Sequence, residues 1–192
     1  IAASTRAGVE PELTIAIDPL VPTAPLIDSL RTLRETFPDL PAHFSTEGLG
    51  GSLRRLRSGS AAIALCLLLP GVPDDIAAYP LLRARMHAVV APGHPLALLG
   101  RPATESDLAP YVQLVLSDPV DPGSANYGVA GTRLWRFVDL GRRFDFLLAG
   151  FGGCRMPEHL VAPLIAVGAL TAIEIHEDPA PPEGLTIYAA HR

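Results

Sequence analysis

The side chains of this sequence that could carry out chemistry include six histidines and two cysteines, and they stand in no catalytic or metal-binding pattern. The histidines lack metal-ligand spacing, and Cys66 and Cys154 form no paired motif of the kind that binds zinc. No G-x-S-x-G motif marks a nucleophilic serine. We therefore expect no catalytic residue, no metal and no cofactor, and we expect that the protein is not an enzyme.

Three features could still contact a bound molecule. The turn Gly48–Ser52 leads from a predicted strand into a helix N-terminus, whose free N–H groups and positive dipole end suit a carboxylate. It is not a Walker A loop, because no Lys-Ser/Thr pair follows; the alternative is a simple tight turn. Asp18 could bond a ligand hydroxyl or amine, or could belong to an ordinary helix start. Cys66 and Cys154 are either a redox pair or two buried structural thiols.

Apolar patterns predict short strands that alternate with helices. The predicted strands are Leu13–Asp18, Ala42–Thr46, Ala62–Leu69, Tyr79–Leu82, Met86–Ala91, Val112–Leu116, Leu134–Val138, Leu170–Ile175 and Leu185–Ala190. The first helix carries Leu26, Leu30, Leu33 and Phe37 on one face. The first half therefore reads β-α-β-α-β, which predicts a parallel sheet flanked by helices.

The second half repeats this alternation after a break near residues 83–95. Asp139 is a good N-cap for one helix, and Pro157 opens another. In the predicted strand Leu134–Val138, we expect the Trp135 side chain to lie in the core. The predicted fold is α/β, with two Rossmann-like lobes and a ligand cleft between them.

Ligands of open α/β sheets bind beyond the carboxyl ends of the strands. Residues that follow a predicted strand or open a helix are therefore the expected contacts of a small molecule. They are Asp18, Leu20, Val21, Glu47, Gly48, Leu49, Cys66, Ser117, Asp118 and Gly153. Because Glu47 and Asp118 are acidic, we expect at most one carboxylate on this molecule, or a neutral aromatic compound.

The composition of the chain argues against nucleic acid and membranes as direct partners. The net charge of −5 opposes binding to phosphate backbones, so this chain by itself should not bind nucleic acid. The longest apolar run, Ala61–Pro70, is much shorter than the roughly 20 residues that span a membrane. There is no signal-peptide pattern and no disulfide framework, which favours the cytoplasm.

Several motifs, in order along the chain, resemble the regulatory domain of LysR-type bacterial transcription regulators. Arg34–Asp39 matches R-x-x-F/Y-P-D/E, and Leu56–Gly59 matches L-x-x-G. His94–Ala97 matches H-P-L-A, and Ala149–Pro157 is similar to A-x-G-x-G-x-x-x-L-P. The family's D-L-A-I strand corresponds to Ala62–Leu65, where its aspartate is lost.

The resemblance implies a fold of the type 2 periplasmic-binding-protein kind. Residues 1–12 would end a linker helix, residues 13–87 and 177–192 would form lobe I, and residues 88–176 would form lobe II. It also implies a small-molecule effector, a homodimer or tetramer that pairs the first lobe of one chain with the second lobe of another, and promoter DNA bound only through a missing N-terminal winged helix. A solute-binding protein of a transporter, which shares this fold, is the alternative.

Overall fold

The computed structural model describes residues 12–121 and 128–192, and the chain divides into two units. Unit 1 comprises Ile1–Leu82 and Thr186–Arg192, and unit 2 comprises Arg83–Leu185. The predicted end of a linker helix, residues 1–12, lies outside the described residues except for Glu12.

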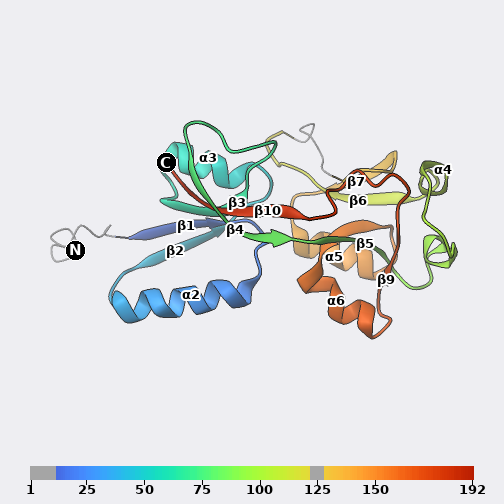
Figure 1. Ribbon diagram of the computed structural model, residues 1–192, viewed down its shortest axis with the longest axis horizontal. Helices are drawn as coiled ribbons and strands as arrows, with labels where there is room; N and C mark the ends of the chain where they lie inside the picture. The colour runs from blue at the N-terminus through green and yellow to red at the C-terminus, as the bar shows by residue number, and fades with distance from the viewer. Residues whose placement is uncertain (1–11, 122–127) are drawn as a thin grey trace. The chain divides into compact units, whose positions relative to one another are not determined.

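Unit 1 is built on a five-stranded sheet of order β2-β1-β3-β10-β4 (Figure 1). The strands are β1 (Leu13–Ile17), β2 (Ala42–Thr46), β3 (Ile63–Leu67), β4 (Ala77–Ala84) and β10 (Leu185–His191). Strand β1 pairs in parallel with both β2 and β3, and β10 runs antiparallel to β3. The β-α-β-α-β prediction is thus confirmed for the parallel part.

Helices α2 (Thr23–Thr36) and α3 (Gly51–Ser58) lie on opposite sides of this sheet (Figure 1). Helix α3 packs Leu56 into a core that includes Ala16, Ala64 and Cys66. Gly50 and Gly59 cap α3 with positive φ angles of 75° and 73°, a conformation that glycine adopts without steric cost.

Helix α2 is different, because none of its residues is buried. The predicted face is present, but its leucines are only half-buried, and Phe37 stays 39% exposed at the C-cap. The sequence pattern shows where the apolar side chains lie, whereas their coverage depends on what packs against the helix.

Unit 2 contains a three-stranded sheet of order β8-β5-β9 and the parallel pair β6-β7. The strands are β5 (Met86–Val90), β6 (Val112–Leu116), β7 (Arg133–Phe137), β8 (Cys154–Pro157) and β9 (Thr171–Ala172). An isolated parallel bridge between Gln113 and Gly153 connects β6 to the start of β8. The predicted strand Leu170–Ile175 is shorter than expected, since Ile175 pairs instead with Ala103.

The helices of unit 2 are η1 (Pro95–Leu98), α4 (Glu105–Leu108), α5 (Leu140–Leu148) and α6 (Glu158–Ala166). The predicted cap of α5 is confirmed, because the Asp139 side chain accepts a hydrogen bond of 2.6 Å from the Arg142 N–H. Pro157 immediately precedes α6, as predicted.

The expectation of a core tryptophan is wrong, because Trp135 is 42% exposed. Strand β7 is hydrogen-bonded only to β6 among the described strands, so it forms a sheet edge. The Trp135 ring contacts Phe146 and Phe151, with ring centroids 6.3 and 5.7 Å apart, and has no further layer of described residues over it. Strand β8 was not predicted, because its glycine-rich approach resembles a loop.

Candidate functional site

The carboxyl ends of β1, β2 and β3 bring together the unit 1 residues that were predicted to bind a ligand. The Asp18 N–H donates to the Leu65 carbonyl at 2.8 Å, and the Glu47 N–H donates to the Ile17 carbonyl at 2.9 Å. Backbone hydrogen bonds thus tie the three strand ends to one another. Leu20 is buried here, and Val21, Gly48 and Leu49 are half-buried.

Asp18 is the most unusual carboxyl group of this edge. It is only 4% exposed, and its Oδ1 accepts a hydrogen bond of 2.8 Å from the Leu20 N–H. Burial raises the pKa of the Asp18 carboxyl from 3.8 to about 6, against the lowering effect of the Leu20 N–H. Asp18 can therefore change its protonation state near neutral pH when its surroundings change.

Cys66 lies next to this carboxyl group. Burial, and secondarily the negative charge of Asp18, raises the pKa of the Cys66 thiol to about 12. Burial likewise raises the pKa of the Cys154 thiol to about 11. Both cysteines are free and buried, so neither is poised as a nucleophile or a redox centre.

The glycine-rich turn places the N-terminus of a helix at the carboxyl edge of the unit 1 sheet. Helix α3 begins at Gly51, whose own N–H donates to the Gly48 carbonyl at 2.9 Å. Among the described residues, the first-turn N–H groups that remain for a ligand are therefore those of Ser52 and Leu53. Gly51 also lies close to Glu47, since an added Cβ would come within 2.8 Å of its carboxylate.

Ser52 was missed by the sequence analysis as a candidate contact. The residue is 3% exposed, and its Oγ is buried without a hydrogen-bond partner among the described residues. A buried hydroxyl without a partner is unfavourable in an unliganded protein. Its place in the first turn of a helix, directly after a glycine-rich turn, is a sequence signal that could have identified it.

Glu47 does not face a ligand as a bare charge, because it forms an ion pair with Arg55. The Glu47 carboxylate therefore repels an anionic ligand less than the sequence predicts. Arg57 pairs with Asp75 on the surface at 2.8 Å. Arg55 and Arg57 of α3 are thus paired with acidic side chains of unit 1.

In unit 2, Ser117 and Asp118 follow the carboxyl end of β6, and both are buried. The Ser117 N–H donates to the Phe137 carbonyl at 2.8 Å, which ties the ends of β6 and β7 together. The Asp118 Oδ1 accepts from the Val120 N–H at 2.8 Å and forms a turn. The Asp118 carboxylate is thus engaged by backbone, which also reduces its repulsion of an anion.

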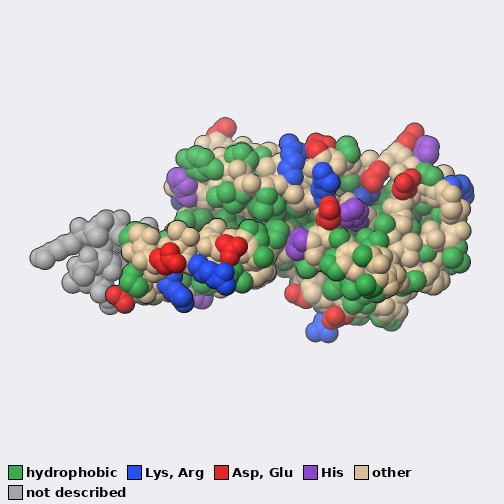
Figure 2. All heavy atoms as spheres, turned by 60° about the horizontal axis from the view of Figure 1, so that its bottom comes forward, with side chains coloured by type: hydrophobic (Ala, Val, Ile, Leu, Met, Phe, Trp, Pro, Cys, Tyr) green, Lys and Arg blue, Asp and Glu red, His purple; other side chains and the backbone are tan. Residues whose placement is uncertain are grey.

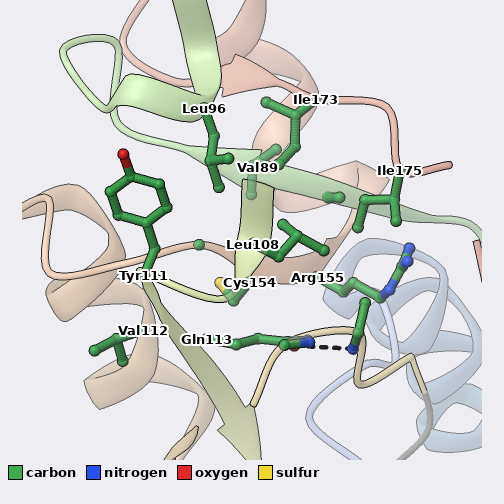
Figure 3. Close-up of a pocket in the computed structure, with 14 residues that line it drawn as sticks. Val89, Leu96, Leu108, Tyr111, Val112, Gln113, Cys154, Arg155, Ile173 and Ile175 are labelled. Carbon is green, nitrogen blue, oxygen red and sulfur yellow. Dashed lines mark hydrogen bonds between the residues drawn. The ribbon is translucent and has the colours of Figure 1, made fainter. Parts of the chain in front are cut away.

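Gly153 lies elsewhere in unit 2, where it lines a small pocket of about 30 Å³ (Figure 3). The pocket walls are mostly aliphatic, with Val89, Leu96, Leu108 and Ile173 among them. At one end Gln113 Oε1 accepts from the Ala130 and Gly131 N–H groups at 3.0 and 2.7 Å. This volume admits one or two water molecules, so in this state it is part of the unit 2 core.

Each unit also has an exposed apolar surface. In unit 1, α2 and β2 border a groove of about 410 Å³ lined by Ile27, Leu30, Phe37 and Phe44 among others. Figure 2 shows hydrophobic side chains beside the charged groups of α2. In unit 2, the aromatic group on β7 and α5 leaves Trp135 and Phe151 42% and 52% exposed.

The described residues 12–121 and 128–192 contain no cluster of His, Cys, Asp or Glu that could hold a metal ion. Within the same residues, every helix is too short or too polar to cross a membrane. What the geometry offers is buried polar groups at sheet edges, which suits recognition of a small molecule.

The fold defines the class of protein, an α/β domain of two units with buried polar groups at the edges of its sheets. The model of the LysR substrate binding domain matches residues 6–192, and the chain belongs to this family. It has the type 2 periplasmic-binding-protein-like fold, and the family match favours the regulator over the solute-binding protein that shares this fold. No curated protein sequence matches it.

Solved structures agree with this fold. A mutant form of the regulatory domain of MetR from N. meningitidis, a LysR family regulator, matches with 19% identity and a TM-score of 0.70, over 94% of this chain and 84% of that one. The effector-binding domain of QuiR in complex with shikimate matches with 17% identity and a TM-score of 0.68, over 94% and 86%. The CcmR regulatory domain of Synechocystis PCC6803 in complex with 2-PG matches with 13% identity and a TM-score of 0.68, over 93% and 86%.

Proposed function

We propose that this chain senses a small metabolite, either a carboxylate or an aromatic compound, for a LysR-type transcription regulator. The observation that carries the proposal is the Ser52 hydroxyl, which is buried at the carboxyl edge of the unit 1 sheet and has no partner in the part of the chain that the structure describes. A ligand oxygen would satisfy this hydroxyl and the first-turn N–H groups of α3. That QuiR was solved with shikimate and CcmR with 2-PG supports a small-molecule effector here.

The proposed contacts are the ten residues predicted from the sequence, with Ser52 added. Asp18, Leu20, Val21, Glu47, Gly48, Leu49 and Cys66 belong to unit 1, and Ser117, Asp118 and Gly153 belong to unit 2. Asp18 would meet a hydroxyl or amine of the effector, while the leucines and Val21 would supply apolar contact. Promoter DNA would be bound in the cytoplasm by a winged helix outside this chain.

A thermal-shift screen of metabolites tests this function, because a ligand that binds the folded chain raises its melting temperature. For any compound that does so, Ser52→Ala should weaken binding without destabilising the ligand-free chain, since the hydroxyl it removes has no partner. Ser58→Ala, which removes an exposed hydroxyl from the same helix, is the matched control. Equal affinity in the wild type and Ser52→Ala would place the effector elsewhere.

We further propose that the chain forms a homodimer or tetramer in which unit 1 of one copy contacts unit 2 of another. The α2/β2 groove and the β7/α5 aromatic group are the apolar surfaces that such pairing would cover. Sedimentation should show a dimer or larger at micromolar concentration, and Phe44→Asp should shift it towards monomer. A wild-type chain that sediments only as monomer would contradict this arrangement.

A further inference from the structure

Arg143 is a buried arginine in α5 whose charge is incompletely satisfied. The residue is only 5% exposed. Nη2 donates to the Arg155 carbonyl at 2.9 Å and to the Met156 sulfur at 3.3 Å. Nε is buried and has no partner among the described residues. Both of these acceptors are neutral, and sulfur is a weak one, so neither of them balances the guanidinium charge.

No acidic side chain among the described residues forms an ion pair with Arg143. Arg155, the other buried arginine of this part of the chain, is paired with Asp178. The nearby Cys154 cannot replace such a partner, because burial raises the pKa of its thiol to about 11 and keeps it neutral. Desolvation correspondingly lowers the pKa of Arg143. A buried charge without a counter-charge is strongly unfavourable, so its presence calls for an anion.

The position of Arg143 on α5 adds to this imbalance. The helix begins at Leu140, shortly after β7 ends, at the same sheet edge as Ser117. Arg143 is therefore the fourth residue of a nine-residue helix, near the end where the helix dipole is positive. That end favours anions and disfavours cations, so the side chain and the helix both favour a negative group.

We propose that Arg143 is the unit 2 counter-charge for one oxyanion group, a carboxylate or a phosphate, of the effector. The inference rests on the proposed sensing function. It deepens this function by assigning a negative charge to the ligand and by naming the residue that binds the charged group. The unpartnered Nε–H would donate to one oxygen of the anion, in a charge-assisted hydrogen bond. Nε is covered in this state, so the entering group would displace the side chains that cover it.

The first test uses the stability of the ligand-free chain. Replacing an uncompensated buried charge by an apolar side chain of similar length removes its desolvation penalty. Arg143→Met should therefore raise the melting temperature by about 2–4 °C or more, whereas Arg142→Met on the exposed side of the same helix should leave it nearly unchanged. A purely structural arginine would give the opposite result, with Arg143→Met clearly less stable than the wild type.

The second test uses benzoate, inorganic phosphate and neutral benzamide as probes at constant ionic strength. Benzoate or phosphate should stabilise the wild type and the Arg142→Met control, and benzamide should stabilise them less. Arg143→Met should bind the effective anion about 10- to 100-fold more weakly. Arg143→Lys, which keeps the charge, should retain part of the response and replaces Arg143→Met if that variant does not fold.

Each outcome decides between the two proposals. Unchanged anion affinity in both Arg143 variants, or a wild type that responds to none of the anions, overturns the role of Arg143. If a metabolite still binds in a Ser52-dependent manner, the sensing function stands without Arg143. If anions bind through Arg143 while no metabolite from the screen binds, the anion site stands and the sensing function fails.

Discussion

Asp18→Asn should stabilise the ligand-free chain, and by an amount that depends on pH. Burial raises the pKa of Asp18 from 3.8 to about 6, so the folded chain holds this proton more tightly than the unfolded chain does. Below about pH 4 the carboxyl group therefore hardly changes the free energy of unfolding. As the pH rises through 6, the buried charge lowers this free energy more and more. Asparagine keeps the oxygen that accepts the Leu20 N–H and removes the charge.

Through this difference in pKa, Asp18 lowers the free energy of unfolding by about 3 kcal/mol at pH 8, about half of this at pH 5, and less than about 1 kcal/mol at pH 4. Urea unfolding followed by circular dichroism at these pH values would measure the difference between Asp18→Asn and the wild type. Asp28→Asn, at an exposed site, is the control and should show almost no pH-dependent difference. A stability difference that is independent of pH, or a variant less stable than the wild type at pH 8, would refute the reasoning.

Three further predictions follow from burial and from the sheet edge. Gly48→Trp should fill the predicted site and abolish effector binding while circular dichroism stays unchanged; a true effector that binds it with wild-type affinity would exclude this turn. Leu56→Ala should lower the free energy of unfolding by about 2–5 kcal/mol, because Leu56 is 1% exposed, whereas Leu98→Ala at a 77% exposed site should change it by less than about 0.5 kcal/mol in urea titrations. Thiol reagents at pH 8 should label Cys66 and Cys154 only as the chain unfolds, since burial raises both thiol pKa values, and rapid labelling of the folded chain would contradict this.

The local elements were largely determined by the sequence. Strand β1, strand β6 and the Asp139 cap of α5 were all predicted, because apolar periodicity and capping chemistry act between residues close in the chain. The motifs from Arg34–Asp39 to Ala149–Pro157 also sufficed to predict the family, which the match over residues 6–192 shows. Strand β8 was missed because the glycines before it resemble a loop, and because its pairing partner β5 lies in a distant part of the chain.

Whether an apolar or charged side chain finds a partner was decided only by the tertiary structure. Trp135 and the apolar face of α2 have the composition of core elements, yet the described part of the chain covers them only in part. Ser52 and Arg143 look like ordinary polar residues in the sequence, and only folding shows that both are buried with an unpartnered atom. The physical reason is that periodicity is a local property, whereas burial and hydrogen bonding depend on residues that meet across many positions of the chain.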